Sequence, residues 1–242
     1  MTVKQSFCES LQTKTEDQFC ANPIWNSPSR PTGKQIVTPV FEVPDCILPN
    51  GGKQLIYVGT YKLSTKLLHG NSISGVLNVA YDVNDAKSLQ GIGKHYEVEN
   101  DDKTVKKYTK YPTQLSKVGL IDGPENNLMT LLAAMYMADQ LLDFLPEDKQ
   151  IEDGMVNIYP HGNLLIHCHD GGSRSVTVAA LYIYYKFYTN QSLYSFEDIY
   201  YQIICYRWSA GAANGHPTEG ICQTAIQLLD TYSEIFPKPI YR

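Results

Sequence analysis

The sequence contains no run of eighteen apolar residues, so no membrane-spanning helix is expected. Its first 20 residues are polar and lack the apolar core of a secretory signal. Basic residues are not in excess, because 20 Lys and Arg stand beside 25 Asp and Glu, which gives a formal net charge of -5 at pH 7. Nucleic acid and acidic membranes both require a broad basic surface, and neither is therefore an expected partner.

The six cysteines are scattered through the chain and include no Cys-x-x-Cys pair. This spacing favours neither a zinc framework nor a dense set of disulfides. Without a signal segment, the expected compartment is the reducing cytoplasm, where a free Cys168 would persist. If Cys168 were oxidised, Cys46, Cys205 or Cys222 could form a disulfide with it, and the sequence does not choose among them.

The composition is that of a globular chain that buries a core, with 43% hydrophobic and 19% charged residues. Residues 1–50 are rich in proline, which predicts an N-terminal arm without long helices that packs on the core or extends from it. Within this arm, residues 36–43 are expected to form an edge strand, because Pro39 lacks a backbone N–H. Residues 51–242 are expected to form the main domain, with a polar insertion near residues 147–162.

Short apolar runs alternate with helical patterns along the main domain. The patterns predict strands at 54–59, 75–80, 117–121 and 163–167, and helices at 61–68, 128–145, 174–188, 196–206 and 218–235. The first two strands and the helix between them suggest a crossover unit with parallel pairing. The polar residues 82–110 are expected to form a solvated loop or hairpin. The prediction is an α/β fold, with a central, mostly parallel sheet flanked by helices on both faces and a site at the carboxyl ends of its strands.

The most informative stretch is LLIHCHDGGSRS, from Leu164 to Ser175. It begins as a buried strand and continues, after two glycines, into a helical pattern. Glycines allow backbone N–H groups to converge on one point, and the helix that begins near Arg174 adds its positive N-terminal end. The layout predicts a phosphate-binding loop formed by His169, Asp170, Gly171, Gly172, Ser173 and Arg174.

The side chains around this loop have the chemistry of nucleophilic attack on a phosphate ester. A positive field favours the thiolate form of Cys168, which is the nucleophilic form. Arg174 can present a planar, permanently charged fork to two phosphate oxygens. Ser175 is a candidate to hydrogen-bond the sulfur and improve it as a leaving group, or is simply the start of the helix. His167 is expected to orient the loop through hydrogen bonds to the backbone.

Two other interpretations of this stretch stay open. The first is a metal site made of His161, His167, Cys168 and His169, although alternation along a strand would place Cys168 opposite the two flanking histidines. The second is a buried structural cysteine without a chemical role.

The motif from His167 to Ser175, His-Cys-x5-Arg-Ser, resembles the signature loop of the cysteine-dependent protein tyrosine phosphatase superfamily, and most of all its dual-specificity branch. Residues 55–59 and 75–79 resemble the first strands of that family. The resemblance covers roughly residues 53–235, so residues 51–242 would be the phosphatase-like catalytic domain and the arm lies outside it.

The resemblance implies that Asp122, at the end of the strand at 117–121, is the general acid. The separation from Asp122 to Cys168 is longer than is usual in the family, and the insertion at 147–162 accounts for it. Glu125 and Asp170 are the alternative acids, and Asp122 could also be an ordinary turn residue. Residues 214–216 are a candidate to position water in the second step, or a plain loop.

The implied function is hydrolysis of phosphate monoesters through a phospho-cysteine intermediate, without a metal or an organic cofactor. In the superfamily that the motif resembles, phosphoinositide phosphatases tend to have basic residues at these loop positions, whereas His169, Asp170 and Ser173 include no Lys or Arg, and Asp170 would repel a polyanionic head group. The resemblance therefore implies that the partners are proteins phosphorylated on tyrosine and on serine or threonine. The alternatives are a non-protein substrate, such as a phosphoinositide, a phosphorylated glucan or an RNA 5′ end, and a non-catalytic module that binds phosphate.

Overall fold

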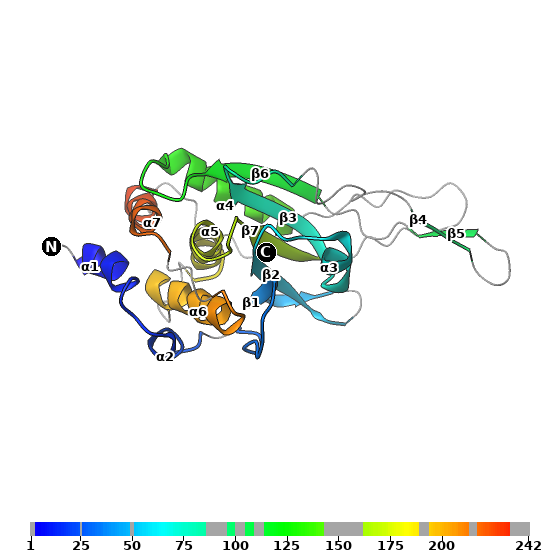
Figure 1. Ribbon diagram of the computed structural model, residues 1–242, viewed down its shortest axis with the longest axis horizontal. Coiled ribbons are helices and arrows are strands. Elements are labelled where there is room, and N and C mark those ends of the chain that lie inside the picture. Colours follow the sequence, from blue (N-terminus) through cyan, green and yellow to red (C-terminus); the bar gives the residue numbers. More distant parts are fainter. Residues whose placement is uncertain are drawn as a thin grey trace.

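The computed structural model describes residues 3–24, 26–48, 51–85, 96–99, 105–108, 114–142, 162–188, 194–212 and 217–232. Its frame is a five-stranded sheet in the order β1-β2-β7-β3-β6 (Figure 1). The strands of this sheet are β1 Val37–Ile47, β2 Lys53–Gly59, β3 Ile73–Ala80, β6 Gln114–Leu120 and β7 Asn163–His167. The pairs formed by β2, β3, β6 and β7 are parallel, and β1 is antiparallel to β2. The predicted α/β fold with a mostly parallel sheet is confirmed.

Strand β7 occupies the centre of the sheet, and all five of its residues are buried. A parallel strand covered on both faces reads as a continuous apolar run, and residues 164–166 have that pattern. β2 and β3 are parallel as predicted, but each pairs with β7 and not with the other, so the expected direct pairing is wrong. His167 is level with Gly59 of β2 and Asn78 of β3, and Cys168 therefore emerges at the carboxyl edge between them.

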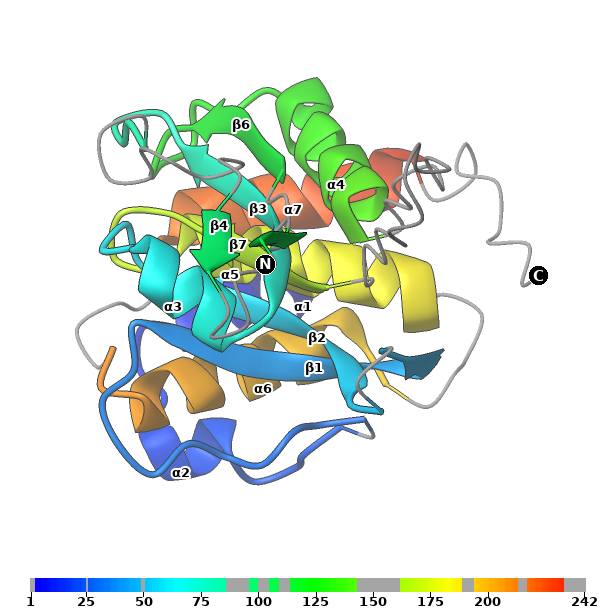
Figure 2. The ribbon, with the colours of Figure 1, turned by 90° about the vertical axis from the view of Figure 1, so that its right-hand side faces the viewer.

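Helices cover both faces of the sheet, as predicted, but unequally (Figure 2). The short α3 Thr65–Gly70 lies on one face, where Leu68 packs in a small cluster with Tyr57, Val76 and Leu165. The larger core lies on the other face, where Ile56, Leu77 and Ile166 meet the remaining helices. Those helices are α4 Leu128–Leu142, α5 Arg174–Ile183, its π-helical continuation η1 Tyr184–Tyr188, α6 Phe196–Ser209 and α7 Glu219–Tyr232.

The N-terminal residues contribute both helices and a strand. The short helices α1 Val3–Ser10 and α2 Glu16–Phe19 lie against α7 and α6, and Leu11 and Phe19 are buried there. The predicted edge strand is present as β1, which includes Pro39 and continues to Ile47. The division into an arm and a catalytic domain near residue 50 stays a prediction.

A disulfide joins Cys20, which ends α2, to Cys205 in α6. Because its sulfur is already paired, Cys205 is not available to form a disulfide with an oxidised Cys168. Of the three cysteines that the sequence left open for this role, Cys205 is therefore excluded. Cys222 is a free cysteine that is buried in α7, and Cys46 lies half-buried in β1.

Local signals place several element boundaries correctly. The strand predicted at 163–167 has those bounds, and Ser195 caps α6 by accepting a hydrogen bond from the backbone N–H of Asp198. Within residues 82–110, β4 Tyr96–Glu99 and β5 Val105–Tyr108 form an antiparallel pair that lies apart from the main sheet (Figure 1). The predicted insertion at 147–162 falls outside the described residues, apart from Gly162. No helix in the described ranges is both long and apolar enough to span a membrane.

Candidate active site

Cys168 follows β7 directly and begins a loop, residues 168–173, that leads into α5; we call it the Cys168 loop. The Cys168 side chain is 2% exposed. Its sulfur accepts a hydrogen bond from the backbone N–H of Gly171 at 3.3 Å, and the Ser175 hydroxyl lies 3.2 Å from it. The fold therefore brings together the Cys168 sulfur, a loop amide and the hydroxyl that the sequence singled out.

The backbone at Gly171 requires glycine. Its φ is +69°, a conformation that side chains rarely adopt. A Cβ there would lie 2.6 Å from the Gly59 carbonyl oxygen and 2.6 Å from Nη2 of Arg207. The close approach of this glycine to Gly59 of β2 and Arg207 of α6 fixes the position of the Cys168 loop relative to these two elements.

Arg174 is the first residue of α5 and is 5% exposed. Its Nη1 is paired with the Asp82 carboxylate and donates to the Leu120 carbonyl oxygen at 3.3 Å. Burial acts to lower the pKa of Arg174, but the hydrogen bond to Asp82 and the charges of Cys168 and Asp82 outweigh it and raise that pKa. In turn, the hydrogen bond from Arg174 lowers the pKa of Asp82. Arg174 is thus a cation that is held in place where the Cys168 loop ends and α5 begins.

Asp122 lies two residues beyond β6, on the rim of the same site. Its Oδ1 accepts a hydrogen bond from the Ser173 hydroxyl at 2.7 Å and one from the Thr218 hydroxyl at 3.0 Å. The turn that carries it is braced by the Asn126 amide, which bonds both the N–H and the C=O of Ile121. Glu125, an alternative acid, is exposed and makes no hydrogen bond to the Cys168 loop within the described part of the chain. The structure therefore brings Asp122 to the loop.

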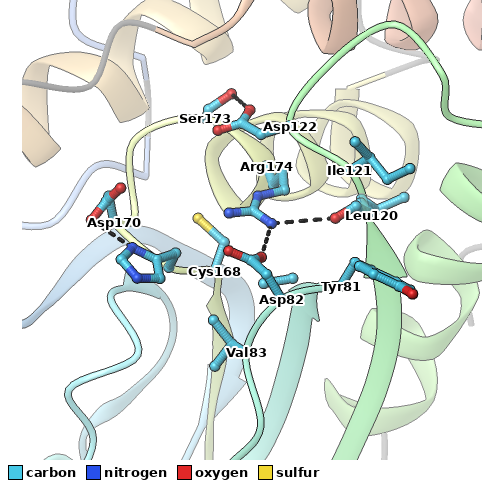
Figure 3. Close-up of polar contacts among 12 residues, drawn as sticks. Tyr81, Asp82, Val83, Leu120, Ile121, Asp122, Cys168, Asp170, Ser173 and Arg174 are labelled. Atoms are coloured by element: carbon cyan, nitrogen blue, oxygen red, sulfur yellow. Dashed lines mark hydrogen bonds and ion pairs between the residues drawn. The ribbon is translucent and has the colours of Figure 1, made fainter.

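The two histidines beside Cys168 have different surroundings. His167 is fully buried, with Nε2 3.0 Å from an Asp85 carboxylate oxygen and Nδ1 3.4 Å from the Cys168 carbonyl oxygen. His169 lies at the surface, where its ring stacks on Tyr61 with 4.6 Å between the centroids. Asp170 turns toward His169, 2.9 Å away, and away from Cys168 (Figure 3). Asp170 is a residue of the Cys168 loop, but its carboxylate is bonded to His169 on the exposed side of that loop.

The metal site that the sequence left open, made of His161, His167, Cys168 and His169, does not form among the described residues. Among these, no three His, Cys, Asp or Glu side chains gather in a way that could hold a metal ion. His161 falls outside the described ranges, as do residues 214–216, the candidate for positioning water.

The sequence does not single out Asp82 and Asp85. Both lie in the predicted solvated loop, but they contact Arg174 and His167 respectively. They follow β3, whose carboxyl end lies beside that of β7. The rule that sites form at the carboxyl ends of parallel strands could have identified them, since the strand at 75–80 was predicted.

Arg207 was also missed. It is 1% exposed in α6 and donates to the Gly171 carbonyl oxygen at 2.8 Å and to the Thr38 hydroxyl at 2.7 Å. Burial lowers its pKa to about 10, and the negative charge of Cys168 opposes that shift. Arg207 therefore stays charged at neutral pH, and it ties the Cys168 loop to α6 and β1. The signal in the sequence that could have identified it is a single arginine within a largely apolar helix.

No protein-family model and no curated protein matches the sequence. The chain is similar in structure to dual-specificity phosphatases over most of its length, at low sequence identity. Human DUSP28 is 13% identical, with a TM-score of 0.44 over 79% of this chain and 98% of that one. The Yvh1 phosphatase domain from Chaetomium thermophilum is 15% identical, with a TM-score of 0.45 over 76% and 94%. OH1 from the Orf virus, a tyrosine phosphatase, is 14% identical, with a TM-score of 0.42 over 94% and 98%.

Proposed function

We propose that this protein hydrolyses phosphate monoesters through a phospho-cysteine intermediate, acting on phosphotyrosine and on phosphoserine or phosphothreonine in proteins. The observation that carries the proposal is the placement of three groups at one point. The Cys168 sulfur, the Gly171 N–H and the Arg174 guanidinium meet at the carboxyl end of β7 and the start of α5. A nucleophile set among fixed donors at a helix N-terminus suits attack on a phosphate group.

In the first step, the Cys168 thiolate attacks phosphorus, and an S–P bond forms as the P–O ester bond breaks. Arg174 and the backbone N–H groups of residues 169–174 stabilise the charge on the three equatorial oxygens. The leaving oxygen takes a proton, and Asp122 is the proposed donor because it lies at the rim beside Ser173.

In the second step, a water molecule attacks phosphorus, and the S–P bond breaks to release inorganic phosphate. Asp122, now a carboxylate, takes the proton from the water. The thiolate is the leaving group in this step, and the Ser175 hydroxyl 3.2 Å away can stabilise its negative charge.

The charges around the site support a substrate with one phosphate group. Asp82 lies beside the Cys168 loop and Asp170 lies within it, and their negative charges would repel a head group that carries several phosphates. Tyr61, 37% exposed and stacked on His169, adds apolar surface beside the loop that suits the ring of phosphotyrosine.

Hydrolysis of p-nitrophenyl phosphate by the wild type and by Cys168→Ser tests the reaction. We expect turnover by the wild type and a loss of about 10³-fold or more in the variant. Full activity of Cys168→Ser would refute the covalent mechanism, and phosphate binding without wild-type turnover would indicate a binding module. A parallel assay of phosphotyrosine and phosphoserine peptides, a phosphoinositide, a phosphorylated glucan and an RNA 5′ phosphate tests the substrate class, and the peptides are expected to react fastest.

A further inference from the structure

We propose that the loop after β3, residues 81–85, is a positioning element of this site. In this role, Asp82 holds Nη1 of Arg174, so that the opposite edge of the guanidinium, formed by Nε and Nη2, receives the phosphate. We call residues 81–85 the Asp82 loop. The inference rests on the anion site of the proposed function. It adds a residue that acts through Arg174 and does not itself touch substrate.

The Asp82 loop is itself held in place from two strands. The buried amide of Asn78 in β3 donates to the Val83 carbonyl oxygen at 3.1 Å, and its oxygen accepts from the N–H of Ala80 at 2.9 Å. Lys117 in β6 donates to the same Val83 oxygen at 2.6 Å and to the Tyr81 oxygen at 3.2 Å. A buried polar side chain and a lysine both bond this short loop, so the fold itself holds the backbone that carries Asp82 and Asp85.

The contacts of Arg174 divide its guanidinium into an occupied side and an open side. Nη1 has two hydrogens, and it bonds both Asp82 and the Leu120 carbonyl oxygen. Within the described residues, buried Nε has no hydrogen-bond partner. A buried donor without an acceptor is unfavourable, so this edge is suited to the oxygens of an incoming anion. Figure 3 shows Nη1 directed toward Asp82 and Leu120 and the opposite side of the guanidinium directed toward Cys168.

The same loop holds a second side chain next to the nucleophile. Asp85 lies 3.0 Å from Nε2 of the fully buried His167, the residue that precedes Cys168. The loop therefore supplies one carboxylate to each of the two side chains that flank Cys168 in the site. The two carboxylates thus orient the side chains of Arg174 and His167, which lie next to Cys168.

A competing role for Asp82 leads to an opposite result. If its carboxylate occupied the place of the substrate phosphate, its removal would free Arg174 and tighten phosphate binding. If it positions Arg174 from the far side, its removal lets the fork rotate and weakens phosphate binding. The measured direction of the change separates the two roles.

The experiment compares Asp82→Ala, Asp82→Asn and Asp82→Glu with the wild type in two measurements. One is the kcat and KM for p-nitrophenyl phosphate, and the other is the affinity for inorganic phosphate by titration calorimetry. We expect Asp82→Ala to lose about 10- to 100-fold in kcat/KM and to bind phosphate about 10-fold more weakly, since a misdirected group can cost this much. Asp82→Glu, which restores a carboxylate, is expected to recover part of both losses, and Asp82→Asn, close in shape, to retain the fold.

Asp139→Asn is the matched control, because it removes a carboxylate of α4 that is paired with Lys186 of η1, at the other end of the α5–η1 helix from Arg174. It should leave both measurements unchanged. Unchanged or tighter phosphate binding by a folded Asp82→Ala, or an unchanged kcat/KM, would overturn the inference. If the wild type bound phosphate without turnover, the proposed function would fail, while the calorimetric comparison would still decide the role of Asp82.

Discussion

Asp82 and Asp122 follow neighbouring strands of one sheet, yet their surroundings suit them to different tasks. Asp82 is paired with the guanidinium of Arg174, whereas Asp122 receives hydrogen bonds from the neutral hydroxyls of Ser173 and Thr218. A carboxylate beside a permanent cation is held in its ionised form and is a poor carrier of a proton. The contrast is consistent with the proposed roles, which are support of Arg174 for Asp82 and proton transfer for Asp122.

The largest expected difference between variants of Asp82 and Asp122 is in how activity depends on the leaving group of the substrate. Asp122→Asn should lower kcat/KM, which reports the first step, by about 10²- to 10³-fold for phenyl phosphate, whose leaving oxygen needs a proton, and by much less for p-nitrophenyl phosphate. Asp82→Asn should lower kcat/KM by a similar factor for both substrates, because Arg174 acts on the phosphate oxygens. The measurement is a kinetic series of aryl phosphates of increasing leaving-group pKa. Equal slopes for the two variants would remove the distinction between the carboxylates.

The two arginines of the site provide the next test, because Arg174 is paired with a carboxylate and Arg207 is held by neutral acceptors. Arg207→Met would leave the buried Gly171 carbonyl and Thr38 hydroxyl without their donor. We expect a loss of about 2–4 kcal/mol in the free energy of unfolding, measured by urea denaturation. Arg30→Met, which breaks an exposed pair with Glu16, should cost less than about 1 kcal/mol. Similar losses in both variants would contradict the role given to Arg207.

The smallest effect concerns pH. Because the hydrogen bond from Arg174 lowers the pKa of Asp82 below its ordinary value of about 4, the ionised carboxylate stabilises the fold above that pH. This stabilisation is lost as the pH falls through the lowered pKa. The difference in Tm between wild type and Asp82→Asn should therefore be present at pH 7 and shrink below about pH 4. A difference that stays constant from pH 7 to pH 3 would show that the charge of Asp82 does not stabilise the fold.

The Cys168 loop could be predicted from sequence because its signals are local. An apolar run, two glycines and a helical pattern lie within a dozen residues, and the structure has β7 and the start of α5 where these signals place them. The supports of the loop could not be found in this way. Asp82 is separated from Arg174 by 92 residues, and Cys20 from Cys205 by 185. Such partners are set by the strand order and by the packing of α6, which local patterns do not specify.

The central claim is that phosphate becomes bonded to Cys168. The most direct measurement is peptide mass analysis of Asp122→Asn after rapid mixing with p-nitrophenyl phosphate and acid quenching, since loss of the base in the second step should let the intermediate accumulate. The account predicts one added phosphoryl group on the peptide that contains Cys168 and none when Cys168→Ser is combined with Asp122→Asn. Product release without any phosphorylated Cys168 peptide, or a phosphoryl group on another residue, would contradict it.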